Sequence, residues 1–220
     1  NEVESSFAQS VVEAPEGATS KVTLPDGTYV WLNAGSRIAY SQGFGVRERN
    51  LSLTGEGYFE VRKNRDMPFN VRSGNLKVRV LGTKFDFRDY PEDPTAMVSL
   101  DEGSVALGLV AKPEDSECRL SPNQRAVLDK KGGSLTVESC DAGAARLWTD
   151  GTIMLNGRRL ADITTDLSRM YAARIVIATP ALANVRFYGV FHRKDQSLVQ
   201  ILNVLAGTGR IKYSVNGNEV

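Results

Sequence analysis

Residue types that commonly build metal and redox sites are scarce in this sequence. Its 220 residues include one histidine, His192, and two cysteines, Cys118 and Cys140. One histidine excludes a metal site with several histidine ligands, and without a Cys-x-x-Cys pair the cysteines do not suggest structural zinc. We expect neither a metal nor a cofactor. The cysteines either form a disulfide between neighbouring strands in an oxidising compartment or are two unpaired small residues, and the sequence leaves both open.

The sequence also lacks a large net charge and a long apolar run. Lys and Arg total 27 and Asp and Glu total 26, so no general positive field attracts nucleic acid or an anionic membrane. No run approaches the roughly 18 apolar residues of a membrane helix. The chain opens on Asn1-Glu2-Val3-Glu4, without an initiator methionine or a signal-peptide core. We interpret it as the soluble part of a longer protein.

Apolar residues that alternate around glycines are the main pattern that is present. In residues 21–36 they flank Pro25-Asp26-Gly27, which predicts two strands joined by a tight turn. Similar spacing returns in residues 51–61, 78–87 and 98–107. We expect the aromatic residues at alternating positions to face a core. These residues are Tyr29, Trp31, Phe59, Phe85 and Phe87.

This pattern predicts a mainly-β domain over residues 20–145. A short alternating run on each side of a glycine turn cannot bury its apolar face alone, so stacked hairpins, or a solenoid-like sheet, would be needed to make a core. The alternative is an ordinary twisted sheet or sandwich with glycine in its turns. Residues 1–19 are expected to form an extended arm that pairs onto a sheet edge.

After about residue 142 the apolar period changes from two to about 3.6. Helical spacing predicts an amphipathic helix over residues 159–172, and Ser197 with Gln200 forms a capping box for a second helix, which ends at Gly207. The strands expected here are residues 153–155, 174–177, 185–191 and 211–215. The βαβ-βαβ order over residues 146–220 describes a small two-layer domain, so we expect an α+β fold for the whole chain.

No set of residues has the pattern of an active site. The carboxylates that raise the hypothesis of a glycosidase are Glu56, Glu60, Asp101 and Glu102. Glu56 and Glu102 lie beside turn glycines, where acidic residues are common for backbone reasons. Gly43-Phe44-Gly45 and Gly55-Glu56-Gly57 lack the lysine and following helix of a phosphate-binding loop. His192 ends a strand and is interpreted as a solvated side chain. We expect no enzyme.

One strand of the C-terminal domain is a candidate docking surface. Phe187 and Phe191 are expected on its buried face, which leaves Arg186, Tyr188 and Val190 on the other face. An exposed strand edge with an aromatic and a β-branched residue can pair with a strand of a partner. If a helix covered this face, it would instead bury Tyr188 and Val190.

An ordered set of motifs runs through the chain. They are LPDGTYVWLNAGS at residues 24–36, LTGEGYFEV at 53–61, Pro68-Phe69, VLGTKF at 80–85 and LDEG at 100–103. This order resembles the FecR family of iron-siderophore sensors, or anti-sigma factors. In residues 120–124, Asn123 departs from the Pro-Gly-Gln turn that is usual there. Residues from Trp148 through Phe187, Gly189 and Phe191 resemble the C-terminal domain of Bacteroidetes-type members.

The resemblance implies a membrane-spanning regulator without catalytic residues. Its cytoplasmic segment would bind an extracytoplasmic-function (ECF) sigma factor, and its periplasmic part would receive a signal from the N-terminal signalling domain of a TonB-dependent outer-membrane transducer. This sequence would be the periplasmic portion, without the cytoplasmic segment and the single-pass inner-membrane anchor. Its C-terminal domain is similar to secretin and TonB short N-terminal domains.

Two hypotheses about binding follow. In the first, Arg186, Tyr188 and Val190 dock the signalling domain of the transducer. In the alternative, the chain is an extracytoplasmic carbohydrate-binding or adhesion module that uses exposed aromatic residues such as Tyr40 and Phe44.

Overall fold

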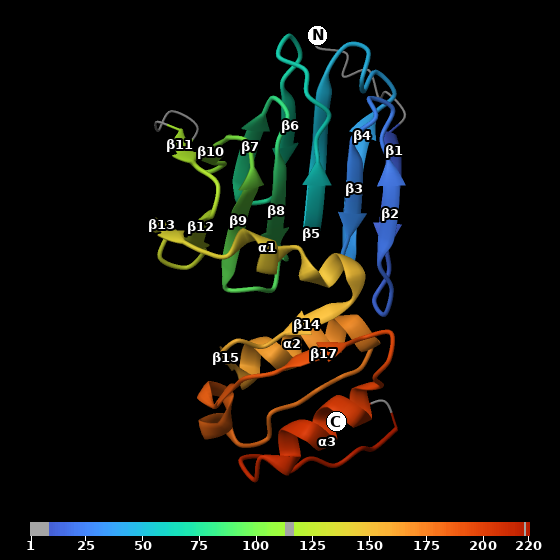
Figure 1. Cartoon of the computed structure of the whole chain (residues 1–220), viewed down its shortest axis with the longest axis vertical. Helices are drawn as coiled ribbons and strands as arrows, with labels where there is room; N and C mark the ends of the chain where they lie inside the picture. Colours follow the sequence, from blue (N-terminus) through green and yellow to red (C-terminus); the bar gives the residue numbers. More distant parts are fainter. Residues whose placement is uncertain (1–8, 113–116, 218) are drawn as a thin grey trace, which may run out of the picture. The chain divides into compact units, whose positions relative to one another are not determined.

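The structure, a computed structural model, describes residues 9–112, 117–217 and 219–220 (Figure 1). These residues form two compact units. Unit 1 contains residues 9–14 and 19–146, and unit 2 contains residues 15–18 and 147–220. Strands dominate the chain and a few helices accompany them, so the predicted α+β, mainly-β class is confirmed. Residues 1–8, which belong to the expected arm, lie outside the described residues.

Unit 1 is built from strands, followed by one short helix. The strands are β1 (Gln9–Ala14), β2 (Ser20–Thr23), β3 (Tyr29–Leu32), β4 (Ser36–Ser41), β5 (Arg49–Glu60), β6 (Phe69–Arg72), β7 (Leu76–Val80), β8 (Lys84–Asp89), β9 (Thr95–Glu102), β10 (Val105–Leu109), β11 (Cys118–Leu120), β12 (Gln124–Asp129) and β13 (Leu135–Ser139), and the helix is α1 (Ala142–Ala145). In the expected arm, β1 pairs with β4 along its full length.

The long strand β5 joins two sheets into a sandwich (Figure 1). Its first half pairs with β4 and β6 in sheet A, whose order is β1-β4-β5-β6-β7-β10-β11. Its second half pairs with β3 and β8 in sheet B, whose order is β2-β3-β5-β8-β9-β12-β13. The inner faces share one apolar core, in which the ring of Phe59 from sheet B lies 6.2 Å from that of Phe69 from sheet A.

Hairpins alternate between the two sheets along the chain. The hairpins β6–β7 and β10–β11 lie side by side in sheet A, and β8–β9 and β12–β13 lie side by side in sheet B. The chain crosses between sheets at Gly82, Gly103 and Asn123, which all have positive φ angles, of 154°, 97° and 62°. A Cβ atom on Gly103 would lie 3.0 Å from the carbonyl oxygen of Gly82, so these two corners are in close contact.

The glycine-spaced segments are therefore not equivalent hairpins. Residues 78–87 and 98–107 contain crossings between the sheets, and only residues 22–31 form a hairpin within one sheet. The prediction of a turn at residues 55–57 is wrong, because strand β5 continues through these residues. Gly55, with φ of 97°, instead marks the point where β5 passes from sheet A to sheet B.

The predicted inward orientation of Tyr29 and Trp31 is also wrong. Val22 lies directly opposite Val30, so Val30 shares the core face with Val22 and is buried. Tyr29 is 44% exposed. The turn, closed by the bond from the backbone N–H of Leu24 to the carbonyl of Thr28, sets this register. The expected inward orientation is confirmed for Phe59, Phe85 and Phe87, which are all buried.

Unit 2 combines short strands with two longer helices. Its elements are a 3₁₀-helix (Leu147–Asp150), β14 (Thr152–Met154), β15 (Arg158–Arg159), α2 (Leu160–Tyr171), a second 3₁₀-helix (Pro180–Asn184), β16 (Arg186–Phe187), β17 (Val190–His192) and α3 (Leu198–Gly207). Both predicted helices are confirmed. The capping box of α3 is present, since Ser197 Oγ accepts from Gln200 N at 3.3 Å and Gln200 Oε1 accepts from Ser197 N at 2.8 Å.

Two predicted strands of unit 2 are wrong. Residues 174–177 and 211–215 are not strands, and the first of these segments makes only an isolated bridge, between Arg174 and Glu219. In residues 174–177 the side chains do alternate, and Ile175 and Ile177 pack against the core. The alternation places side chains correctly, but a strand also needs a ladder of backbone bonds along its length. Among the described residues, the segment 174–177 is joined to Val220 by two bonds, from Val176 N to Val220 O and from Val220 N to Arg174 O, and residues 211–215 pair with no strand.

Candidate interaction surface

The expected docking strand, residues 185–191, is interrupted in the middle. Its first part, β16, pairs with β15, and its second part, β17, pairs with β14. Two 2.9 Å backbone bonds, from Leu155 N to Gly189 O and from Gly157 N to Phe187 O, connect the two ladders. The register shifts by one residue between the ladders, so the chain bulges around Asn156 and Gly157.

The two faces of this interrupted strand differ as predicted. Phe187 and Phe191 are buried in the core of unit 2. Tyr188 is 75% exposed and Val190 is 53% exposed, and Arg186 is exposed as well. The possibility that a helix buries this face is therefore wrong. Whether these three residues bind a partner stays a prediction.

Gly157 holds the exposed side chains in place. Arg186 Nη1 donates to the carbonyl oxygen of Gly157 at 2.7 Å. A Cβ atom on Gly157 would lie 3.0 Å from Tyr188 Oη, so the tyrosine ring lies against bare backbone. Gly157 also has a φ of 77°, which favours glycine. Gly157 was not among the residues predicted to matter, although Asn156-Gly157 is a strong turn signal.

Exposed apolar side chains are concentrated in unit 2. Among the described residues, the large ones in this unit are Val176, Tyr188, Val190, Val199, Val204 and Val215. The larger unit 1 has five, which are Val11, Tyr29, Val46, Leu81 and Val137.

Three of the four carboxylates considered for catalysis, Glu56, Asp101 and Glu102, are engaged in structural contacts. Glu56 is buried, and its Oε2 accepts from Asn33 Nδ2 at 2.7 Å. Tyr58 donates to Asp101 Oδ2 at 2.8 Å. The ammonium of Lys84, 2.8 Å from Glu102 Oε2, lowers the pKa of that carboxyl. A lowered pKa keeps a carboxyl ionised, which is unsuited to a general acid.

The remaining candidates for small-molecule or metal chemistry have no supporting geometry. His192 is exposed, and its Nδ1 lies 3.5 Å from Thr152 Oγ1. Within the described ranges, no group of three or more His, Cys, Asp or Glu side chains could hold a metal ion. Cys118 and Cys140 are both free thiols. No helix in the described part of the chain is long and apolar enough to cross a membrane.

The aromatic residues named for carbohydrate binding pack inside unit 1. Phe44 is buried, and its ring lies 5.1 Å from that of Tyr40 and 5.8 Å from that of Phe69. Phe44 therefore offers no open ring face to a sugar. The expectation that Tyr40 and Phe44 form an exposed aromatic platform is wrong.

Comparison with known proteins agrees with the two-unit structure. The family described as FecR protein matches residues 10–106, and the family described as FecR, C-terminal matches residues 152–220. A search of curated proteins finds no match. Two crystal structures of a candidate anti-sigma factor from Parabacteroides distasonis ATCC 8503, at 1.65 and 2.50 Å resolution, superpose with TM-scores of 0.86 and 0.85.

These two structures share 30% sequence identity with this chain. The alignments cover 96% of this chain in both cases, and 96% and 97% of the chains in the crystal structures. The similarity therefore extends over both units, in the order in which the two family matches occur. The chain belongs to the FecR family of anti-sigma regulators.

Proposed function

We propose that this chain is the periplasmic part of a regulator that connects an outer-membrane transducer to a sigma factor. In this proposal, unit 2 binds the N-terminal signalling domain of a TonB-dependent transducer. The signal then passes through the inner-membrane anchor to a cytoplasmic segment, which controls an ECF sigma factor. The observation that carries the proposal is the exposed face of Arg186, Tyr188 and Val190, within the unit that matches the C-terminal family.

The chemistry of this face suits protein binding. Tyr188 presents a large ring that is supported from behind by Gly157, so it loses little conformational freedom when a partner covers it. Arg186 uses one of its five N–H donors on the carbonyl of Gly157, which leaves donors for carboxylates or carbonyls of a partner. Tyrosine and arginine are the residue types that often dominate binding energy at interfaces.

The proposed action requires binding alone. Family membership supports a regulatory role, and three of the four carboxylates that could suggest hydrolysis are held in structural contacts. A signal can pass along the chain when partner binding favours one of two conformations. The shift in their equilibrium is limited by the difference in the partner's affinity for the two conformations. No chemical step is needed for this.

Calorimetric titration of the whole chain with the signalling domain of the transducer encoded beside it tests the proposal. We expect Tyr188→Ala combined with Arg186→Ala to weaken binding at least about tenfold. Val190→Ala and Val204→Ala form a matched pair, because both valines are 53% exposed and lie on different elements of unit 2. The first should weaken binding and the second should not.

Two results would count against the proposal, in different ways. Binding by the wild-type chain that is unchanged in the Tyr188 and Arg186 variant would mean that another surface is used. Absence of binding by the wild-type chain would reject the transducer as the partner of this part of the protein.

A further inference from the structure

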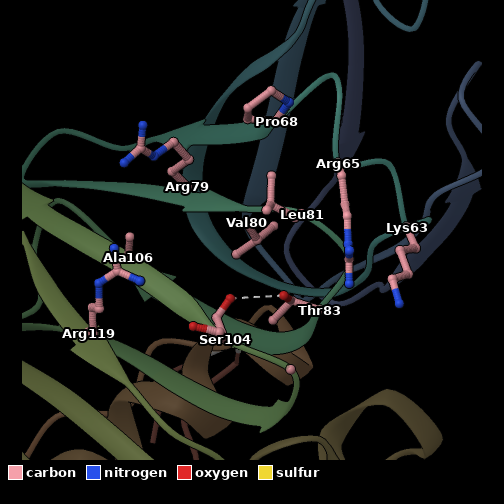
Figure 2. Close-up of a pocket in the computed structure, with 12 residues that line it drawn as sticks. Lys63, Arg65, Pro68, Arg79, Val80, Leu81, Thr83, Ser104, Ala106 and Arg119 are labelled. Carbon is pink, nitrogen blue, oxygen red and sulfur yellow. Dashed lines mark hydrogen bonds between the residues drawn. The ribbon is translucent and has the colours of Figure 1, made fainter.

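Unit 1 contains a concave groove that the proposed function does not use. Its volume is about 440 Å³, and it lies between the loop of residues 61–68 and strands β7, β10 and β11 (Figure 2). Gly82 and Gly103, the corners where the chain crosses between the sheets, also line it. The groove is therefore formed by the backbone path of the sandwich, and not by a single flexible side chain.

Basic side chains border the groove on opposite sides. Figure 2 shows Lys63 and Arg65 on one side and Arg79 and Arg119 on the other. Lys63, Arg65 and Arg119 are exposed and have no carboxylate partner among the described residues. Arg79 Nη2 lies 2.8 Å from Glu117 Oε2. Among the described residues, four cations border the groove and one carboxylate, Glu117, is paired with them, in a chain whose formal net charge is +1.

The strand register explains the hollow between the two arginines. On the central strand, β10, Ala106 is paired with Arg79 of β7 on one side and with Arg119 of β11 on the other. A short side chain thus separates two long ones in the same row. Neighbouring strands lie about 4.8 Å apart, so the two arginine backbones are separated by about 10 Å, and the alanine between them leaves a hollow within this basic border.

The floor of the groove is apolar. Pro68, Val80 and Leu81 lie between the two basic borders (Figure 2), and Leu81 is among the exposed large apolar residues. Thr83 Oγ1 donates to the carbonyl of Ser104 at 3.0 Å, so this hydroxyl donor is already used within the protein. An occupant would therefore meet apolar surface in the middle and positive charge on both sides.

We propose that this groove binds an extended, acidic peptide segment of a partner protein. Acidic side chains on the face of the segment away from the floor would pair with the long side chains of Lys63 and Arg65 and of Arg79 and Arg119, while alternate apolar side chains on the other face would contact the floor. A membrane surface fits less well, because a flat headgroup layer does not enter a hollow between two basic borders. The proposal does not depend on the one for unit 2, since no residue is shared.

Fluorescence anisotropy with the whole chain and two labelled heptapeptides tests this inference. One probe alternates Asp and Val, and the matched probe has Asn in place of each Asp. We expect the Asp peptide to bind at least about tenfold more tightly at low ionic strength, and to lose this advantage as salt is added. If the two probes bind equally, or neither binds, the proposal is wrong.

Charge-reversal variants locate the site. Arg65→Glu combined with Arg119→Glu should weaken binding of the Asp peptide at least about tenfold. Lys131→Glu is the matched control, because Lys131 is an exposed lysine in the turn between β12 and β13, outside the groove, and should leave affinity unchanged. All three side chains are exposed, so the variants should keep the thermal stability of the wild type.

Two further results would overturn the proposal. Equal affinity of the wild type and of the Arg65 and Arg119 variant would show that the peptide binds elsewhere. Vesicles containing phosphatidylglycerol provide the last comparison. If the chain binds these vesicles through Arg65 and Arg119 but does not bind the Asp peptide, the groove is a membrane contact.

Discussion

Arg49 is a buried arginine in the interior of unit 1 that makes several hydrogen bonds. Its side chain is 1% exposed, and its Nη1 lies 3.1 Å from Asp26 Oδ2. It also donates to the carbonyl oxygens of Met67 at 2.7 Å, through Nε, and of Arg62 at 2.8 Å. These bonds fix the loop that carries Lys63 and Arg65. A lysine has no planar set of donors to replace them.

The sequence contains a signal for this burial, although the charge obscures it. Arg49 is two residues before Leu51 and four before Leu53, so in a strand all three lie on the same, inward face. In the sequence, the Arg47-Glu48-Arg49 triplet looks like an ordinary exposed, charged approach to a strand. Only the distant partners Asp26 and Met67 show that the charge is buried and paired, and no local pattern identifies them.

Asn123 forms a corner of the fold with a left-handed backbone. It stands where the family usually has glycine, and it adopts a left-handed φ of 62° at the crossing between β11 and β12. Asparagine tolerates this region better than other residues with a side chain. Its backbone N–H donates to Leu100 O, and its carbonyl accepts from Cys140 N, both at 2.9 Å. The corner is therefore kept without glycine.

Tyr58 should make the stability of unit 1 sensitive to alkaline pH. Burial, together with the hydrogen bond to Asp101, raises the pKa of Tyr58 above its ordinary value of 10.0. The unfolded chain therefore loses this proton before the folded chain does. The stabilisation is complete below about pH 10 and is lost as pH rises toward the folded-state pKa, by at most about 1.4 kcal/mol per pH unit.

Urea unfolding of the wild type and of Tyr58→Phe, compared from about pH 8 to about pH 11, measures this effect. The variant loses the hydrogen bond to Asp101, so it should be less stable by about 1 kcal/mol below pH 10. Above that pH the difference should shrink, because only the wild type loses stability through this phenol. If the free energies of unfolding of the two proteins changed with pH in parallel, Tyr58 would not be the source of this pH dependence.

Among the elements of the fold, local signals predicted the helices better than the strands. The helices α2 and α3 follow from apolar spacing and a capping box, which act within a few residues. A strand depends on a partner elsewhere in the sequence, which explains why residues 174–177 and 211–215 were wrongly assigned. The same limit applies to the glycine-spaced segments, since the spacing alone does not distinguish a hairpin from a crossing between sheets.

The crossing within β5 should be intolerant of any side chain at Gly55. A Cβ atom there would lie 2.8 Å from Ser36 Cα and would also collide with Ser36 Oγ, and φ is 97°. We expect Gly55→Ala to lower the free energy of unfolding by about 2–4 kcal/mol, from overpacking and backbone strain together. Urea denaturation at neutral pH measures this.

Gly133 provides the matched control for this prediction. It also has a positive φ, of 68°, but a Cβ atom there would have no neighbour within 4 Å. Gly133→Ala should therefore cost only about 1 kcal/mol, from the backbone conformation. Equal losses in the two variants would mean that the close approach to Ser36 contributes nothing.

Across the whole molecule, the sequence was sufficient for the fold class and the family, but not for the groove. Period-two and period-3.6 patterns identify strands and helices, and the order of motifs identifies the family. The exposed face at Tyr188 was also predictable, because one short segment, residues 186–190, supplies all three residues. The groove combines residues from 63 to 119, which become neighbours only through the sheet order, so no sequence pattern indicates it.

The two units have separate apolar cores, so we expect them to lose structure separately. Leu167 is buried in the core of unit 2 and Leu100 in that of unit 1. Each leucine-to-alanine change should destabilise its own unit by about 2–5 kcal/mol. Hydrogen exchange should show faster exchange in α2 and β14 for Leu167→Ala, and in β5, β8 and β9 for Leu100→Ala. If either variant accelerates exchange equally in both units, the chain unfolds as one cooperative body, because a loss confined to one core would leave the protection of the other unchanged.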